Sequence, residues 1–350
     1  MTKSPPPSSI GERDGLTSSL LGGQTEAGWE DAQERPLEFK LQLAYTISWV
    51  VNFLLLGAKA YAFWLSGSKA VLAALVDSFV DLVSQLVIFV AERQSRRANS
   101  RFPVGQARLE TIGVLVCALL MALASFQVIE QSCVGLYEGF VKHELPTIEA
   151  GLILYAVLGG ATLLKAICYV QCSVLASKSD SMVALAEDHL NDIFSNVAAA
   201  ATAVIAVKLE GAWWADPAGA IAISAYILWR WFDIAKSQVD KIVGRAAPAS
   251  FIEQLTEIGE AHDDCVLVDC IRAYHVGAKY MVEMEIVMPV TATLKQVHDV
   301  ALALQHKIEA LEPVERAFVH VDYTLRDQPE HRTERLLRGL PVLREETLDS

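Results

Sequence analysis

The stretch Asp188-His189-Leu190-Asn191-Asp192 is the part of the sequence from which the fold class follows. It lies inside residues 181–207, a segment that otherwise has the apolar composition of a membrane-spanning helix. Residues four apart share one face of a helix, so Asp188 and Asp192 project to the same side. A carboxylate at the centre of a bilayer costs about 2.5–3.5 kcal/mol on insertion scales, so this pair indicates a functional site.

A second pair of aspartates occurs upstream at the same spacing. Asp77 and Asp81 are again four residues apart, inside the apolar run of residues 70–91. If the two helices face each other, the four carboxylates of Asp77, Asp81, Asp188 and Asp192 converge on one point. Such a cluster would bind a divalent cation, or protons in its place.

The composition predicts a membrane bundle with one small soluble domain. The chain has 350 residues, 53% of them hydrophobic, and the apolar runs fall between residues 43 and 232. Its net charge of −13 argues against nucleic acid as a partner. We therefore expect an α-helical membrane protein, with the lipid bilayer as its environment.

The apolar runs predict six transmembrane helices, at residues 43–65, 70–91, 111–130, 148–170, 182–207 and 218–232. The connection between the second and third contains the most basic short loop, with Arg93, Arg96, Arg97, Arg101 and Arg108. The positive-inside rule places this loop, and with it both termini, in the cytoplasm. The expected location is the membrane of an organelle of the Golgi or vacuolar type, or the plasma membrane.

The polar regions divide the rest of the chain. Residues 1–40 begin with a Pro- and Ser-rich run and are predicted to be a disordered cytoplasmic tail. Residues 41–240 form the transmembrane domain, 247–325 a cytoplasmic α+β domain, and 326–350 a loose, charged tail. Within the α+β domain we expect the order helix, strand, strand, helix, strand, at residues 250–260, 265–275, 280–288, 293–311 and 317–323.

Three stretches together resemble the cation diffusion facilitator family: Val76-Asp77-Ser78-Phe79-Val80-Asp81, then Arg101-Phe102-Pro103-Val104-Gly105-Gln106-Ala107-Arg108-Leu109-Glu110, and the residues from Asp188 to Asn196. The likeness extends over about residues 43–331. It implies six membrane helices with metal ligands in the second and fifth, a cytoplasmic ferredoxin-like domain, and a homodimer.

Several shorter runs resemble the manganese group of that family, which is common in plants and fungi. They include Gly57-Ala58-Lys59-Ala60-Tyr61-Ala62, Glu315-Arg316-Ala317-Phe318-Val319-His320 and Gln328-Pro329-Glu330-His331. In zinc-preferring members the first ligand of the fifth helix is histidine, whereas here it is Asp188 and the histidine follows as His189. One step along a helix rotates a side chain by about 100°, so His189 is not expected simply to replace Asp188 as a ligand.

Oxygen ligands suit hard ions such as Mn²⁺, and imidazole favours zinc and its neighbours. Because clustered carboxylates repel one another, an arriving metal would expel protons, and arriving protons would expel metal. The sequence therefore predicts a divalent metal/proton antiporter that exports Mn²⁺ from the cytosol, with H⁺ as counter-ion. It predicts no resident cofactor and no enzymatic activity.

Other polar residues are weaker candidates. Asn52 fits either a hydrogen bond between helices or the ion path, and His189 fits a hydrogen bond between helices or direct metal contact. The resemblance matches His298, His320 and Asp322 to positions that bind regulatory metal between subunits in zinc-type relatives. The fuller ligand set is not evident, so a plain dimerisation surface is the other interpretation.

The sequence leaves two alternative functions open and excludes a third. The same fold could transport Zn²⁺ or Fe²⁺, or it could be a metal-gated channel or sensor. An intramembrane aspartyl protease also uses two membrane aspartates, but it needs a Gly-x-Gly-Asp turn. Asp77 follows Leu75-Val76 and Asp192 follows Leu190-Asn191, so neither aspartate fits that pattern.

Overall fold

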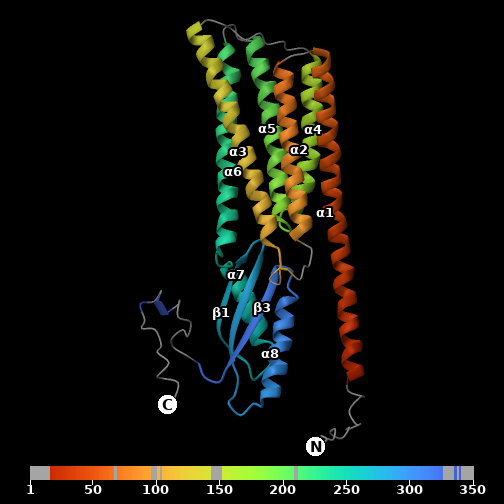
Figure 1. Cartoon of the computed structure of the whole chain (residues 1–350), viewed down its shortest axis with the longest axis vertical. Coiled ribbons are helices and arrows are strands. Elements are labelled where there is room, and N and C mark those ends of the chain that lie inside the picture. Colours follow the sequence, from red (N-terminus) through yellow and green to blue (C-terminus); the bar gives the residue numbers. More distant parts are fainter. Residues whose placement is uncertain are drawn as a thin grey trace, which may run out of the picture.

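The structure is a computed structural model that describes residues 16–66, 69–95, 101–102, 105–142, 152–208, 212–325, 335, 336 and 339. Figure 1 shows two parts stacked end to end: a bundle of long helices and a small domain built on a sheet. This is the predicted fold class, a helical membrane domain followed by a small α+β domain.

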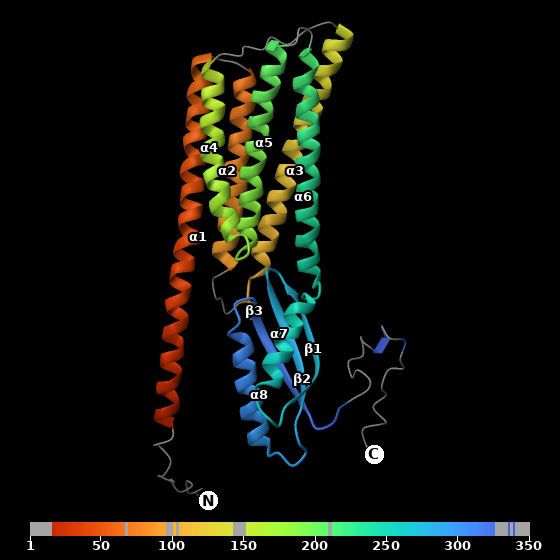
Figure 2. The ribbon, with the colours of Figure 1, turned by 180° about the vertical axis from the view of Figure 1, so that it is seen from behind.

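The bundle contains the six predicted long helices. They are α1 (Leu16–Ser66), α2 (Lys69–Ser95), α3 (Arg108–Tyr137), α4 (Leu152–Leu175), α5 (Asp180–Lys208) and α6 (Ala215–Val243). Two short helical turns, η1 (Glu138–Lys142) and η2 (Ala212–Trp214), extend α3 and precede α6. The long helices lie side by side, and the chain reverses direction at each connection (Figures 1 and 2).

Within the described residues, four segments are long and apolar enough to cross a membrane: Phe39–Leu65, Ala74–Ser95, Arg108–Val141 and Leu158–Leu175. Helices α5 and α6 have comparable lengths, 29 residues each. They contain more charge, because α5 carries the aspartate pair and α6 carries Arg230 and Asp233. These charged residues explain why α5 and α6 are not among the four apolar segments.

Two predicted boundaries differ from the structure. Helix α1 already begins at Leu16, inside the region 1–40 that the sequence predicts to be disordered. Residues 16–35 contain good helix formers such as Leu, Ala, Gln and Glu, but also Gly22, Gly23 and Gly28, so helix propensity alone does not account for the extension. Helix α6 continues to Val243, well past the predicted end at 232, because its charged final turns remain helical. Residues 1–15 and most of the tail after 325 lie outside the described residues.

The helices of the bundle pack through buried side chains and close backbone contacts. Val114 and Cys117 of α3 are fully buried in the same cluster as Leu185 of α5 and Trp231 of α6. At Gly113 of α3, an added Cβ would lie 2.4 Å from the Cβ of Ala91, so this glycine allows α2 and α3 to touch. Inside a membrane such contacts hold helices together, since lipid tails are as apolar as the side chains.

The small domain confirms the predicted order of elements. It consists of α7 (Ala249–Glu260), β1 (Leu267–Val276), β2 (Lys279–Val287), α8 (Leu294–Glu309) and β3 (Val314–Asp322). The sheet has the order β1-β2-β3, with β1 and β2 antiparallel and β2 and β3 parallel. A parallel pair needs a crossover connection, which α8 provides. Helices α7 and α8 lie on one face of the sheet (Figure 2) and bury a core that includes Leu255, Val282, Ile286, Leu304 and Ile308.

The small domain is joined to one end of the bundle by specific contacts. Lys178, between α4 and α5, forms an ion pair of 2.7 Å with Glu312, between α8 and β3. Gly277, in the turn between β1 and β2, lies so close to α3 that an added Cβ would be 2.6 Å from the backbone nitrogen of Arg108. The small domain therefore sits at the end of the bundle where Arg108 lies.

Candidate metal centre

The candidate site is built on α5, whose first turn is fixed by two neighbouring helices. A carboxylate oxygen of Glu110 on α3 accepts hydrogen bonds from the Ser179 hydroxyl at 2.7 Å and from the Ser181 backbone N–H at 3.2 Å. The ammonium group of Lys241 on α6 contacts both carboxylate oxygens of Asp180, at 2.6 and 2.7 Å. These contacts set the height of α5 in the bundle, and with it the position of the two aspartates further along.

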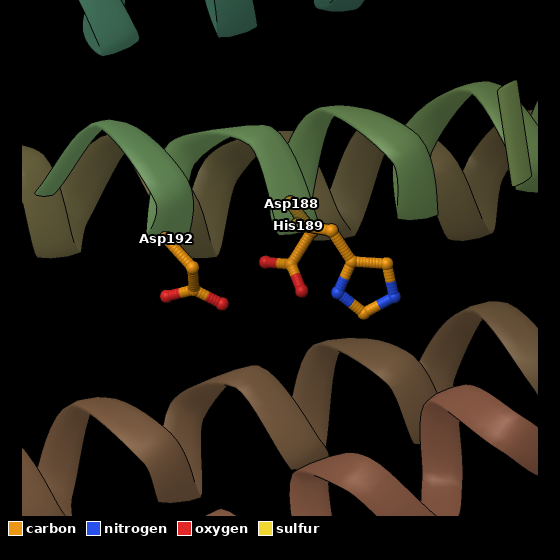
Figure 3. Close-up of side chains that lie close together, drawn as sticks. All are labelled: Asp188, His189 and Asp192. Atoms are coloured by element: carbon orange, nitrogen blue, oxygen red, sulfur yellow. The ribbon is translucent and has the colours of Figure 1, made fainter. Parts of the chain in front are cut away.

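Three acidic or imidazole side chains of α5 come together. Asp188, His189 and Asp192 each offer one ligand atom, and these atoms lie within 4.8 Å of one another. Figure 3 shows the three side chains on the same side of α5, pointing toward the neighbouring helices. In the part of the chain that the structure describes, no other group of three or more His, Cys, Asp or Glu residues meets this distance.

Asp188 is the most unusual member of the group. Its side chain is 2% exposed, and neither of its carboxylate oxygens has a hydrogen-bond partner among the described residues. A buried carboxylate is normally paired or hydrogen-bonded, because leaving it without a partner is costly. Asp188 therefore presents two buried acceptor oxygens, whose charge a cation or a proton would neutralise.

The ring of His189 lies closer to Asp188 and Asp192 than a rotation of about 100° per residue along a helix predicts. It is fully buried, and its Nε2 atom is 2.7 Å from the hydroxyl oxygen of Ser48 on α1. Its Nδ1 atom has no hydrogen-bond partner among the described residues. The ring thus makes the predicted hydrogen bond between helices, and it also lies within ligand distance of both aspartates.

A lysine that the sequence analysis missed completes the site. Lys165 of α4 is 3% exposed and forms an ion pair with Asp192. Its ammonium group also donates a hydrogen bond of 2.7 Å to the amide oxygen of Asn52 on α1, and the Asn52 amide nitrogen donates one of 2.8 Å to Gln85 on α2. The available signal was that Lys165 is the only charged residue of α4.

The two aspartates of α2 stand beside this group but do not belong to it. Asp81 is partly buried and lies near enough to Asp188, Asp192 and Lys165 for their charges to act on it. Asp77, one turn away, is exposed and lies within range of the charges of Lys59 and Asp192. The structure thus brings Asp188 and Asp192 together and holds Asp77 and Asp81 on a neighbouring helix.

A further ion pair links α5 to α6 next to the site. The guanidinium group of Arg230 contacts the carboxylate of Glu187, which is 12% exposed. Glu187 precedes Asp188 in sequence but is not part of the three-residue group. It therefore serves to hold the two helices together.

The candidate residues of the small domain form no comparable cluster. His298 on α8 and His320 on β3 are exposed, and Asp322 is partly exposed. Glu285 stands opposite His320 in the register of β2 and β3 and is ion-paired with Arg272 at 2.6 Å. A regulatory metal in this domain therefore stays a prediction.

Comparison with known proteins matches both parts of the chain. Residues 45–243 match the cation efflux transmembrane domain, and residues 247–324 match the cytoplasmic domain of cation efflux proteins. The chain is 36% identical over 293 residues to metal tolerance protein 10 of Arabidopsis thaliana, covering 83% of this chain and 67% of that protein. It is 35% identical over 309 residues to metal tolerance protein 3 of Oryza sativa subsp. japonica, covering 86% and 74%.

Proposed function

The chain belongs to the cation efflux family of membrane transporters, and on this premise we propose that it exports Mn²⁺ from the cytosol in exchange for protons. The destination would be an organelle or the outside of the cell. The relatives are named for metal tolerance, which fits removal of a metal from the cytosol.

The observation that carries the proposal is the buried carboxylate of Asp188, which has no hydrogen-bond partner among the described residues. Asp192 lies within ligand distance of it, and Asp81 of α2 lies near enough for the charges of both aspartates to act on it. We assign Asp77, which is exposed one turn from Asp81, to the route by which the ion reaches or leaves this centre. Oxygen donors in this number favour Mn²⁺ over the softer Zn²⁺.

The position of His189 bears on the choice of metal. One of its nitrogens, Nε2, is engaged by Ser48, so a metal can reach the ring only through Nδ1. The other nitrogen is free to contact a metal held by Asp188, so a mixed oxygen and nitrogen site is the form that would favour Zn²⁺ or Fe²⁺. We propose Mn²⁺ because most of the candidate ligands are carboxylates and only His189 would supply nitrogen.

Exchange for protons follows from the same carboxylates. Two or more buried carboxylates close together cannot all keep their charge without a cation between them. When the metal leaves, protons would neutralise them, and when metal binds, those protons would be released. We propose that both termini face the cytosol, and that the cytoplasmic domain pairs with a second copy to form a homodimer.

The test is Mn²⁺ uptake into proteoliposomes under an imposed proton gradient, with Zn²⁺ and Fe²⁺ measured beside it. We expect gradient-dependent Mn²⁺ uptake that is lost in Asp188→Asn and Asp192→Ala. The matched control is Asp240→Ala, which removes an aspartate of α6 whose ion pair with Arg245 is far more exposed.

Preferred uptake of Zn²⁺ would overturn the argument from ligand type. Metal flux that ignores the proton gradient would overturn the exchange and favour a channel. Uptake that survives in both site variants would show that the metal passes elsewhere.

A further inference from the structure

Lys165 is a buried positive charge in direct contact with a carboxylate of the proposed site. Its ammonium group contacts Asp192, and the charges of Asp188 and Asp81 also act on it. It arises from α4, whereas the proposed ligands lie on α2 and α5. Buried charges inside a membrane are costly and are usually functional, so this lysine needs an explanation beyond packing.

A metal ion and the ammonium group of Lys165 need the same partner. Asp192 has two carboxylate oxygens, and Lys165 contacts one of them directly. Two cations within a few ångströms repel each other strongly where water is largely excluded. A divalent ion that binds Asp188 and Asp192 must therefore push the ammonium group away from Asp192.

Asn52 offers the ammonium group of Lys165 a second hydrogen-bond partner. Its amide oxygen already accepts a hydrogen bond from Lys165, at 2.7 Å. Its orientation is fixed because its amide nitrogen donates to Gln85, which leaves the oxygen facing Lys165. A small shift of a flexible lysine side chain from Asp192 toward Asn52 would keep it hydrogen-bonded throughout.

We propose that Lys165 is a tethered cation that competes with the transported metal for Asp192, and that Asn52 holds its ammonium group when the metal occupies that carboxylate. This inference rests on the proposed function. It assigns Lys165 a positioning role: it weakens metal binding and speeds release, because the departing ion is replaced by a cation that cannot diffuse away.

The first test measures Mn²⁺ binding to the purified full-length protein by titration calorimetry at one fixed pH. Lys165→Met keeps the length of the side chain and removes its charge, so we expect Mn²⁺ to bind about tenfold more tightly or better. Lys165→Arg restores the charge and should bind as the natural chain does. Lys178→Met is the matched control, since Lys178 is exposed and pairs with Glu312 at the junction with the small domain.

Transport kinetics distinguish the proposed positioning role of Lys165 from a purely structural role. In proteoliposomes, Lys165→Met should lower both KM and kcat for Mn²⁺, because the ion enters a stronger site and leaves it more slowly. A lysine that merely held the helices together would instead lower kcat with KM unchanged or raised.

Asn52→Ala is expected to change the affinity for Mn²⁺ in the opposite direction to Lys165→Met. Without the amide oxygen, Lys165 has only Asp192, so Mn²⁺ should bind more weakly than to the natural chain. In a Lys165→Met background the same change should have little effect, because Asn52 acts through the lysine. If Lys165→Met is too unstable to purify, Asn52→Ala in the natural chain still tests the inference, because Mn²⁺ binding as tight as that of the natural chain, or tighter, would overturn it.

Unchanged or weaker Mn²⁺ binding by Lys165→Met would overturn the inference, as would an equal loss on Asn52→Ala in both backgrounds. Failure of the proposed function looks different. In that case the natural chain would show no saturable Mn²⁺ binding, or binding that Asp192→Asn leaves intact.

Discussion

The Nε2 atom of His189 lies 2.7 Å from the hydroxyl oxygen of Ser48, and this contact joins the site helix α5 to α1. Both residues are completely buried. The contact engages one ring nitrogen of His189 while the other faces Asp188 and Asp192. The serine therefore holds the imidazole in the orientation that points its other nitrogen toward the two carboxylates.

Ser48→Ala is expected to shift metal preference away from zinc. The Ser48 hydroxyl holds the ring through Nε2 with Nδ1 toward the two carboxylates, and its loss frees the ring to turn away, so zinc loses a nitrogen ligand that it favours more than manganese does. We expect the ratio of Zn²⁺ to Mn²⁺ uptake to fall several-fold. The control is Ser125→Ala on α3, because Ser125 is also buried but bonds only to the carbonyl of Met121 in its own helix. A ratio unchanged in Ser48→Ala would argue against this role.

Asp188→Leu is expected to stabilise the protein and abolish its response to metal. The natural side chain is a buried carboxylate without a hydrogen-bond partner among the described residues, and such a group costs about 1–3 kcal/mol. Leucine has the same number of side-chain heavy atoms in the same branched arrangement, so the melting temperature in detergent without metal should rise by a few degrees. Added Mn²⁺ should stabilise the natural chain and leave the variant unaffected.

A lower melting temperature for Asp188→Leu without metal would show that this carboxylate has a partner in the folded protein. Asp188→His tests the same position for selectivity and should move preference toward zinc. Glu187→His is its control, since Glu187 pairs with Arg230 outside the group of three.

Gly277→Val is expected to disturb the junction between the small domain and the bundle. Gly277 has φ +73°, and an added Cβ would lie 2.6 Å from the backbone nitrogen of Arg108. Gly339 has a similar φ of +68°, but nothing lies within 4 Å of its added Cβ. Both valines therefore suffer backbone strain, and only Gly277→Val adds a collision. Thermal unfolding should show a larger loss for Gly277→Val, and equal losses would mean that strain alone matters.

The small domain is expected to lose stability below about pH 6.5 because of His275. Burial and the positive charge of Lys241 lower the pKa of His275 from its ordinary value of 6.5. The unfolded chain therefore takes up a proton first as the pH falls, and folding weakens from pH 6.5 downward through the folded pKa. Thermal unfolding of the full chain at about pH 7.5 and 5.5 should show this difference reduced in His275→Gln. The exposed His298, changed to Gln, is the control.

The fold could be predicted from the sequence because its signals are long and periodic. Apolar runs define six helices, and alternation in residues such as Met281 to Val287 defines a strand. Helix ends were harder, since α6 continues through charged turns to Gly244, where the left-handed conformation at φ 93° ends it. The start of α1 at Leu16 was not predicted because the tail combines a Pro- and Ser-rich run with glycine and acidic residues and offers few apolar side chains to bury.

The site was predictable only in part, for a physical reason. Spacing of four within one helix places Asp188 beside Asp192, and the structure has them close together. Contacts between helices depend on rotation and depth, which spacing does not give. Asp77 is therefore exposed instead of joining the group, and Lys165 reaches Asp192 from α4, a helix in which the sequence analysis proposed no ligand.

The most direct test of the central claim is to locate Mn²⁺ by anomalous X-ray scattering in crystals of the full-length protein soaked with the metal. We predict a strong peak in the bundle, within about 2–2.5 Å of oxygens of Asp188 and Asp192, and its loss in Asp188→Asn. Peaks confined to the small domain, or a bundle peak that remains in Asp188→Asn, would contradict the assignment of these carboxylates as the transport site.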